Sequence, residues 1–398
     1  MKHILLVPDG MADEPLSELG GKTPLEAAHT PNMDALAHNG FSGMVQTIPD
    51  GMPPGSDIGN LSLLGYEPKV NFSGRAPLEA ANMGILLNAD EVAFRCNLVT
   101  LLKGKMHDYS AGHISTDEAS QIIESLNSNI ANGHLKFYAG KSYRHLLVIK
   151  SAHIKELLDM KTVPPHDIIE ADTAEHLPKG PSRDFLLKIM ADARKVLADH
   201  PVNKKRSDRS ENTATDIWLW GQGKKPNLPL FKEKFGLSGA IISAVDLVNG
   251  IGRLAGLEVI NVPGATGYFD TDYSAKINYA LNTLERHDFV YVHVESPDEA
   301  GHLGDYKEKV KAIEAIDRDM VGKLIQWSKG RNDYRILICP DHPTPVSKRT
   351  HTHAPVCFLM AGQGIIANHL SGYSEKIAFN AGLKFTSGAQ MVSQFLKN

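Results

Sequence analysis

Residues 289–302 read FVYVHVESPDEAGH, a strand-like run followed at once by a polar segment with metal-ligand side chains. The run 289–294 is rich in β-branched and aromatic residues, which is typical of a buried strand. Asp298 and His302 lie four positions apart, so on a helical turn both side chains point the same way. The stretch therefore predicts a buried strand that ends beside a pair of potential metal ligands.

The same pattern recurs along the chain, where short apolar runs alternate with segments of helical periodicity. The other strand-like runs are 4–7, 240–245, 259–262 and 335–339, and the helical segments include 31–37, 271–286 and 306–329. Strands that alternate with helices favour a mostly parallel sheet with helices on both faces. The predicted fold class is therefore α/β.

The length of 398 residues suggests two domains, or one large core that carries an insertion. The least regular stretch is 203–212, NKKRSDRSEN, which is polar and dense in charge. We interpret it as a linker rather than as a basic phosphate-binding patch. Residues 71–204 would then form a smaller domain, inserted into a sheet domain made of 1–70 and 205–398.

Composition and charge exclude several classes of protein. With 42 Lys and Arg against 46 Asp and Glu, the net charge of −4 argues against nucleic-acid binding by bulk electrostatics. Three scattered cysteines, Cys96, Cys339 and Cys357, cannot build a disulfide framework or a thiolate metal site. No apolar run reaches the about 18 residues that span a bilayer, and the N-terminal run is too short for a signal peptide. We expect a soluble cytoplasmic protein that binds neither nucleic acid nor membranes.

Metal-ligand side chains follow several predicted strands at their carboxyl ends, where open α/β sheets bind ligands. The candidates are Asp9, Asp298, His302, Asp341, His342 and His351. His353 is an alternative to His351, because both lie in the loop THTHAPVCF. Carboxylates and imidazoles without thiolates suit Mn²⁺, Zn²⁺, Co²⁺ or Mg²⁺, and this set suffices for two ions about 4 Å apart. Each element alone is also explained by a turn or a solvated helix start; their joint placement at strand ends favours a metal centre.

Ser56 lies in the loop DGMPPGSDIGNLSLLGYEP, residues 50–68, where two prolines and a glycine precede a predicted helix. The pattern places Ser56 at the N-cap of that helix, near its positive end. Capping alone would explain the residue. Beside a metal ion, however, a serine hydroxyl loses its proton more easily and becomes a nucleophile. No Gly-x-Ser-x-Gly elbow is present, so metal activation is the better explanation.

An ordered set of motifs resembles the archaeal-type cofactor-independent phosphoglycerate mutases, which belong to the alkaline phosphatase superfamily. The set runs nearly end to end: VPDGMADEP, PPGSDIGNLSLLGY, GRAPLEAANMG, DYSAGHIS, SYRHLLV, WLWGQG, ISAVDLVNGIG, GATGYFDT, PDEAGH, DHPTP and THTHAPVCF. The resemblance implies a mostly parallel, alkaline-phosphatase-like sheet flanked by helices, with a smaller α/β domain that closes over the substrate. Cys357 departs from the family pattern, which has proline there.

The resemblance also carries site roles onto matching positions. It implies one divalent ion held by Asp9, Ser56, Asp341 and His342, and another held by Asp298, His302 and His351. With Ser56 as nucleophile, the enzyme would be an isomerase that interconverts 3-phosphoglycerate and 2-phosphoglycerate through a phosphoserine intermediate, in glycolysis and gluconeogenesis, without bisphosphoglycerate. Both a monomer and a homo-oligomer are compatible with it.

The inserted domain would bind the rest of the phosphorylated small-molecule substrate through basic side chains. Candidates are Arg75, His113 and Arg144, for which surface or capping polarity is an equally good explanation. Two alternatives remain: a superfamily relative that acts on another metabolite, such as a homoserine kinase-like phosphotransferase, a phosphatase or a phosphonate hydrolase, and a catalytically silent metal-binding protein. Loss of turnover in Ser56→Ala would distinguish an enzyme from the silent protein.

Overall fold

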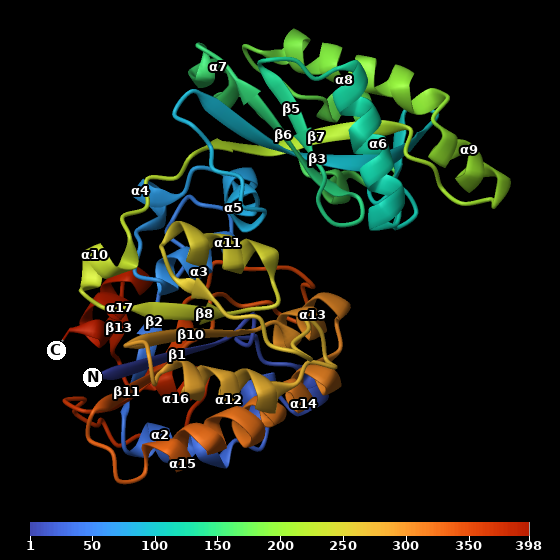
Figure 1. The fold of residues 1–398 in the computed structure, drawn as a ribbon. Coiled ribbons are helices and arrows are strands. Elements are labelled where there is room, and N and C mark those ends of the chain that lie inside the picture. Colours follow the sequence, from blue (N-terminus) through green and yellow to red (C-terminus); the bar gives the residue numbers. More distant parts are fainter. Residues whose placement is uncertain (398) are drawn as a thin grey trace. The chain divides into compact units, whose positions relative to one another are not determined.

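The computed structural model describes residues 1–397 and divides into two compact units (Figure 1). Unit 1 comprises Met1–Phe72 and the chain from Asn227 onward, and unit 2 is the inserted segment Ser73–Pro226. The two connections between them run side by side. On the unit 1 side Asn71 Nδ2 donates to the Asn227 carbonyl at 2.6 Å, and on the unit 2 side Ser73 Oγ donates to the Lys224 carbonyl at 2.6 Å.

The predicted linker at 203–212 is wrong, and with it the domain boundary after residue 204. Helix α9, Pro201–Asp208, occupies most of that stretch, and strand β7, Asp216–Lys224, follows it within unit 2. One of the charges that suggested a solvated linker is instead buried and paired inside the unit. Arg206 is buried, with Nη1 2.7 Å from Glu118 Oε2 and Nε donating to the Asn212 carbonyl at 2.9 Å.

Unit 1 is built on an eight-stranded sheet that is mostly parallel, as predicted. The strand order is β13-β2-β12-β11-β1-β10-β8-β9, and only the β11–β12 and β12–β2 pairs are antiparallel. The strands are β1 (Lys2–Pro8), β2 (Phe41–Val45), β8 (Gly239–Ile242), β9 (Glu258–Val259), β10 (Phe289–Val294), β11 (Tyr334–Ile338), β12 (Val356–Gly362) and β13 (Lys384–Phe385).

Helices cover both faces of this sheet (Figure 1). On one face Ile4 and Leu6 of β1 share a core with Met33, Ile277 and Ile313, which belong to α2, α12 and α14. On the other face lie α3, α11 and α17. The α-helices of unit 1 are α1 (Pro24–Ala27), α2 (Pro31–His38), α3 (Ser56–Leu63), α4 (Pro68–Asn71), α10 (Phe231–Phe235), α11 (Asp246–Leu254), α12 (Tyr273–Thr283), α13 (Ser296–Leu303), α14 (Tyr306–Ile316), α15 (Gly322–Ser328), α16 (Glu375–Asn380) and α17 (Gly388–Leu396).

The helix predicted over 306–329 is interrupted. Between α14 and α15 the turn Asp317–Val321 is a π-helix, which inserts extra backbone into the helical ladder. There the buried Asp317 carboxylate accepts hydrogen bonds from the backbone N–H groups of Asn32, at 3.2 Å, and Met33, at 2.7 Å. It thus satisfies free donors at the N-terminus of α2, a tertiary contact that helical periodicity alone does not reveal.

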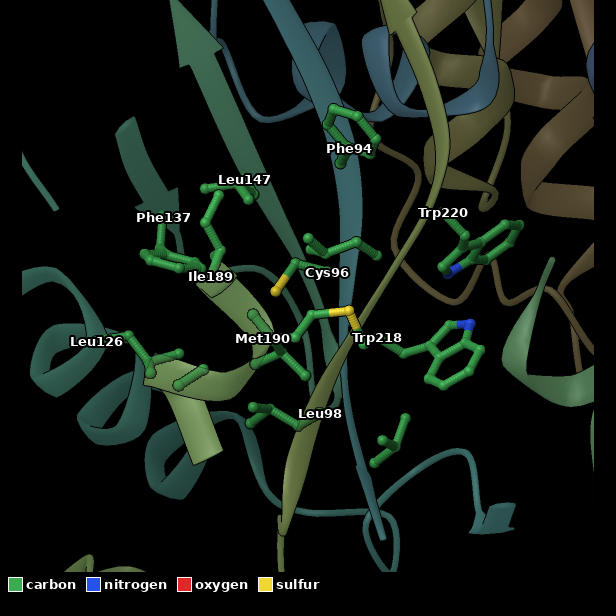
Figure 2. Packing of buried hydrophobic residues seen from close by; sticks show 14 of the residues in the cluster. Phe94, Cys96, Leu98, Leu126, Phe137, Leu147, Ile189, Met190, Trp218 and Trp220 are labelled. Atoms are coloured by element: carbon green, nitrogen blue, oxygen red, sulfur yellow. The ribbon is translucent and has the colours of Figure 1, made fainter. Parts of the chain in front are cut away.

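Unit 2 has an antiparallel sheet with β3 at its centre. Strand β3 pairs with β4, β6 and β7, and β5 pairs with β6. Figure 2 shows its core, where Cys96 and Leu98 of β3 lie on the same side of the sheet as Ile189 and Met190 of α8, while Trp218 of β7 lies on the other side. The remaining elements are β3 (Glu91–Leu102), β4 (Lys105–Asp108), β5 (Leu135–Tyr138), β6 (Arg144–Lys150), α5 (Arg75–Asn82), α6 (Thr116–Asn129), α7 (Ile154–Leu158) and α8 (Arg183–Ala198).

None of the helices within residues 1–397 is long and apolar enough to cross a membrane.

Arg206→Ala should lower the free energy of unfolding of unit 2 by about 3 kcal/mol. The change leaves Glu118 without its buried partner and removes donors from the Ala111 and Gly112 carbonyls, which accept from Arg206 Nη2 at 3.0 and 3.2 Å. Urea unfolding followed by tryptophan fluorescence, with Trp327 of unit 1 replaced by Phe in all variants, reports on this unit, because the other two tryptophans, Trp218 and Trp220, lie in its core.

Lys204→Ala is the matched control, since its side chain is 65% exposed and lies 3.7 Å from Asp199, whose side chain is 91% exposed. It should change the stability by less than about 0.5 kcal/mol. Equal unfolding midpoints for the two variants would mean that the segment behaves as a solvated linker after all.

Candidate metal centre and nucleophile

The candidate ligands gather at one edge of the unit 1 sheet because three parallel strands end there. Pro8 of β1 pairs with Val294 of β10, so Asp9 and Glu295 leave the sheet side by side, and the Asp9 N–H donates to the Val294 carbonyl at 2.9 Å. Strand β11, the other neighbour of β1, leads to Asp341. Parallel pairing brings together residues that lie more than 300 positions apart in the sequence.

Asp298, His302 and His351 form one group at this edge. Helix α13 begins two residues after β10 and presents Asp298 and His302 on one face. Asp298 Oδ2 lies 3.2 Å from His302 Nε2, and Asp298 Oδ1 lies 3.5 Å from His351 Nε2. The two imidazoles approach to 2.9 Å through their Nε2 atoms. The structure thus brings these three side chains together.

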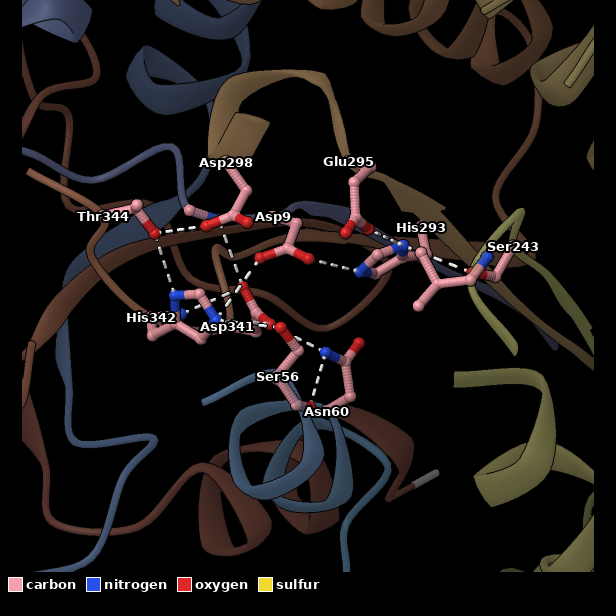
Figure 3. A network of polar contacts seen from close by, with 12 residues as sticks. Asp9, Ser56, Asn60, Ser243, His293, Glu295, Asp298, Asp341, His342 and Thr344 are labelled. Carbon is pink, nitrogen blue, oxygen red and sulfur yellow. Dashed lines mark hydrogen bonds and ion pairs between the residues drawn. The ribbon is translucent and has the colours of Figure 1, made fainter. Parts of the chain in front are cut away.

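Asp9, Ser56, Asp341 and His342 form a second group (Figure 3). His342 Nε2 lies 3.5 Å from Asp9 Oδ1, 3.4 Å from Asp341 Oδ2 and 3.1 Å from Ser56 Oγ. Asp9, Asp341 and His342 are fully buried. Asn60, one turn after Ser56 on α3, donates to Asp341 Oδ2 at 2.7 Å and so joins the helix to the carboxylate.

The sequence predicted Ser56 as the N-cap residue of its helix, and this prediction is wrong. Gly55 occupies the cap position and Ser56 is the first residue of α3, and its hydroxyl makes no capping hydrogen bond. Because the hydroxyl is not used by the backbone, it points at His342. The position still places the oxygen at the positive end of the helix.

Of the two alternative histidines, the structure brings His351 into the cluster. The His353 side chain is exposed, and its carbonyl accepts a hydrogen bond from Gln46 Nε2 at 2.8 Å. His353 thus meets none of the other candidate ligands through a hydrogen bond or ion pair found within residues 1–397.

Sequence reasoning missed two members of the cluster, His293 and Glu295. His293 Nε2 lies 3.0 Å from Asp9 Oδ2, and its Nδ1 lies 3.3 Å from Ser243 Oγ and 3.6 Å from Glu295 Oε2 (Figure 3). The signal was present in the sequence. Alternate residues of a strand share a face, so His293 and Glu295 continue the side on which Tyr291 donates to Asn60 Oδ1 at 2.6 Å.

The crowding of acids strongly perturbs the proton affinities of the cluster. Burial, followed by the charge of Asp341, raises the pKa of Asp9 well above its usual value. Burial would also raise the pKa of Asp298, but hydrogen bonds with His302 and His351 outweigh it and hold that pKa well below the usual value. The neighbouring acids therefore differ sharply in how readily they lose a proton.

The cluster fits divalent cations. Both carboxylate oxygens of Asp9 are buried, and neither receives a hydrogen bond from the residues that the structure describes, 1–397. Three sets of side chains within residues 1–397 place their ligand atoms within 4.8 Å of one another: Asp298 with His342 and His351, Asp9 with His293 and Asp341, and Asp9 with Glu295 and Asp298. Buried carboxylates without donors need compensating positive charge, and carboxylates with imidazoles are ligands of such ions.

The predicted substrate residues Arg75, His113 and Arg144 all belong to unit 2, where they contact aromatic rings. The Arg75 guanidinium carbon lies 5.9 Å from the Trp220 ring centre, and that of Arg144 lies 5.2 Å from the Tyr143 ring centre. The His113 ring meets Tyr143 at 6.3 Å, from a residue with a left-handed backbone (φ +48°).

Further residues connect these contacts into what we call the cationic–aromatic cluster. Tyr109 stacks edge-on against both Tyr143, at 5.6 Å, and His166, at 6.1 Å, and His166 meets Trp220 at 5.5 Å. Arg95 lies 4.2 Å over Trp220 and pairs with Glu79 at 2.9 Å. Burial lowers the pKa of Arg95 to about 10, against the opposing charge of Glu79, and the nearby charges of Arg75 and Arg144 add smaller contributions. Sequence reasoning missed Arg95 because it lies inside a strand.

Comparisons with known proteins place the chain in a family. The family model for 2,3-bisphosphoglycerate-independent phosphoglycerate mutase matches residues 37–203. A probable enzyme of that name from Geobacter sulfurreducens is 49% identical over 100% of both chains. One from Methanothermobacter thermautotrophicus is 50% identical over 94% of this chain and 92% of its own. The chain belongs to the 2,3-bisphosphoglycerate-independent phosphoglycerate mutases.

Solved structures agree with this assignment. A protein from Pyrococcus horikoshii is 30% identical with a TM-score of 0.83, and the match covers 99% of this chain and 96% of that one. The cofactor-independent phosphoglycerate mutase from Thermoplasma acidophilum is 26% identical with a TM-score of 0.68, over 100% of this chain and 99% of that one. The predicted α/β fold is therefore confirmed by structures of the family.

In this mutase chain a buried ion pair anchors the loop that carries Asp341 and His342. Lys309 Nζ of α14 lies 2.7 Å from Asp13 Oδ2, and both side chains are fully buried. Asp13 also accepts a hydrogen bond from the Val346 N–H at 3.1 Å. Lys309 and Asp13 thus tie α14, the loop after β1 and the loop after β11 to one another.

Glu375, at the start of α16, adjoins this pair. Its Oε1 accepts from the Asp13 N–H at 3.2 Å, and its Oε2 accepts from Thr23 Oγ1 at 2.7 Å. Burial raises the pKa of Glu375 to about 7, although the two hydrogen bonds and the charge of Lys309 favour the ionised form. The carboxyl group is therefore protonated more easily in the folded chain than in the unfolded one.

Glu375→Gln should stabilise the chain at pH 8 by about 3 kcal/mol and leave its stability nearly unchanged at pH 4. A folded-state pKa above the unfolded value means that ionisation opposes folding, and this cost grows as pH rises from 4.5 to about 7. Glutamine keeps the acceptor for Asp13 and cannot ionise. Thermal unfolding in the presence of chelator, across pH 4–8, measures the difference.

Glu233→Gln, on the exposed surface of α10, serves as the control and should show no such pH-dependent difference. A constant offset between Glu375→Gln and the unmodified chain at every pH would contradict the raised pKa.

Proposed function

We propose that this chain interconverts 3-phosphoglycerate and 2-phosphoglycerate, in glycolysis and gluconeogenesis, through a phosphoserine on Ser56 and without bisphosphoglycerate. The observation that carries the proposal is the position of Ser56. Ser56 is the first residue of α3, and its hydroxyl does not cap the helix. The hydroxyl oxygen lies 3.1 Å from His342 Nε2, beside buried carboxylates. Membership in the mutase family supports phosphoglycerate as the substrate.

Two divalent cations, of Mn²⁺, Zn²⁺, Co²⁺ or Mg²⁺, would be held by the two groups of side chains. One ion would be held by Asp9, Ser56, Asp341 and His342, and the other by Asp298, His302 and His351. The Asp9 oxygens, which accept no hydrogen bond from the described residues, support this assignment. When bound, such ions supply positive charge for the phosphoryl oxygens and lower the proton affinity of the serine hydroxyl.

The chain's own residues then carry the transfer. The Ser56 oxygen attacks phosphorus in line, the bond from phosphorus to the substrate oxygen breaks, and glycerate stays bound. The phosphoryl group returns from Ser56 to the other glycerate hydroxyl, which gives the isomer. The N-terminus of α3 favours the negative charge that gathers on the phosphoryl oxygens throughout.

Water must be kept from the phosphoserine while glycerate turns, and we assign this task to unit 2 as a closing substrate domain. Arg75 and Arg144 would bind the glycerate carboxylate, and His113 would exchange a proton with a glycerate hydroxyl. The cationic–aromatic cluster supports the assignment, because it confines several guanidinium groups within one region of the unit.

Ser56→Ala should lower the rate of 3-phosphoglycerate isomerisation by at least about 10³-fold, because no other hydroxyl lies in contact with His342 Nε2 in the part of the chain that the structure describes. The assay couples formation of 2-phosphoglycerate to a downstream enzyme. It uses chelator-stripped protein supplied with Mn²⁺, Co²⁺, Zn²⁺ or Mg²⁺ in turn and contains no bisphosphoglycerate.

The matched control is Ser62→Ala, a buried serine six residues further along α3 whose hydroxyl has no hydrogen-bond partner among the described residues. It should keep activity within about threefold. Release of inorganic phosphate without isomerisation would reject the mutase and retain a phosphohydrolase, and full activity of Ser56→Ala would reject the phosphoserine.

Arg144→Ala should raise KM for 3-phosphoglycerate by about 10–100-fold, since a charge-assisted hydrogen bond to the carboxylate is lost. Mn²⁺ affinity should stay unchanged, because Arg144 belongs to unit 2 and the candidate ligands belong to unit 1. Lys141→Ala, an exposed cation three residues earlier, is the control. Equal KM values for the two variants would count against this role of Arg144.

A further inference from the structure

We infer that Thr344 is a positioning residue that joins the two groups of ligand side chains and fixes the ring of His342 in one tautomer. Its hydroxyl is fully buried and has two partners (Figure 3). It donates to Asp298 Oδ1, and it lies 3.3 Å from His342 Nδ1. Asp298 belongs to one group and His342 to the other, so this oxygen links both.

The count of hydrogens decides the tautomer. A threonine hydroxyl carries one hydrogen, and an ionised carboxylate can only accept, so that hydrogen points to Asp298. The lone pairs of Thr344 Oγ1 then face His342, whose Nδ1 must supply the hydrogen of that contact. In a neutral imidazole the other nitrogen, Nε2, is left with its lone pair.

The nitrogen thus freed is the one that faces the site. His342 Nε2 lies 3.1 Å from Ser56 Oγ, 3.4 Å from Asp341 Oδ2 and 3.5 Å from Asp9 Oδ1. A cation bound among these oxygens needs an unprotonated nitrogen, and hydrogen bonds to the far side of a histidine ring set its tautomer and direction. This step rests on the proposed metal centre.

The backbone of Thr344 is held as firmly as its hydroxyl. Its carbonyl accepts from Lys309 Nζ at 2.8 Å, and its N–H donates to the Ala12 carbonyl at 3.2 Å. Two glycines make room for it. A Cβ on Gly301 would lie 2.3 Å from the Thr344 carbonyl oxygen, and one on Gly10 would lie 2.6 Å from its hydroxyl. The hydroxyl therefore has little freedom to turn elsewhere.

Two substitutions separate the hydroxyl from the packing of the side chain. Thr344→Val removes the hydroxyl at nearly constant volume, and Thr344→Ser keeps the hydroxyl but removes the methyl group. Titration calorimetry of chelator-stripped protein with Mn²⁺ is the readout. We expect Thr344→Val to weaken Mn²⁺ binding by about 10–100-fold, and Thr344→Ser to stay within about threefold of the unmodified chain.

Thr283→Val is the matched control. Thr283 of α12 is also buried, and the substitution removes a 2.7 Å hydrogen bond from its hydroxyl to the Tyr279 carbonyl, away from the site. It should leave Mn²⁺ binding unchanged, and thermal unfolding in chelator should show all three variants folded.

Unchanged Mn²⁺ affinity in Thr344→Val would overturn the inference, as would an equal loss in Thr344→Ser, since packing would then explain it. The result is independent of isomerisation. A chain that binds Mn²⁺ with the expected order of affinities but does not isomerise phosphoglycerate would support Thr344 and reject the proposed function. If the unmodified chain isomerises phosphoglycerate but Thr344→Val binds Mn²⁺ with unchanged affinity, the proposed function is supported and the role of Thr344 is rejected.

Discussion

Mutual repulsion among Asp9, Asp298 and Asp341 is the constraint on which the site depends. All three carboxylates are buried at one edge of a sheet, and the oxygens of Asp9 receive no hydrogen bond. Such a concentration of negative charge opposes folding unless positive charge is supplied. The strand ends and the loops behind them hold the three acids close together, an arrangement that fits divalent cations.

Several contacts around the acids fix their positions. Parallel pairing of β1 with β10 and β11 aligns the strand ends, and Asn60 fixes Asp341 from α3. The buried pair of Asp13 and Lys309 then secures the loops behind them. The Lys309 ammonium group is fully buried and paired with Asp13. Its positive charge offsets nearby negative charge, and it does not occupy the position of a metal ion among the candidate ligands.

Much of this could be read from the sequence, because parallel sheets leave a simple signature. Apolar runs predicted five of the eight strands of the unit 1 sheet, and Asp or His residues after them predicted the sheet edge and most of the candidate ligand side chains. His293 was missed because it lies within a strand, whereas the predicted ligands lie beyond the strand ends. Glu295 directly follows the same strand, as Asp9 follows β1, and was passed over although the signal was present. The linker at 203–212 failed for a related reason: burial of Arg206 depends on partners such as Glu118, 88 positions away, which local charge cannot reveal.

The side-by-side connections between the two units have a genetic consequence. Asn71 contacts Asn227, and Ser73 contacts Lys224, so the chain leaves unit 1 and returns to it at nearly one point. The sheet that carries the acids is encoded by two separated stretches of gene, yet its path through space is almost continuous. Insertions, deletions or wholesale exchange of residues 75–222 can therefore accumulate without disturbing the strand order of the sheet. The scaffold of the reacting groups and the part assigned to substrate choice are free to evolve at different speeds.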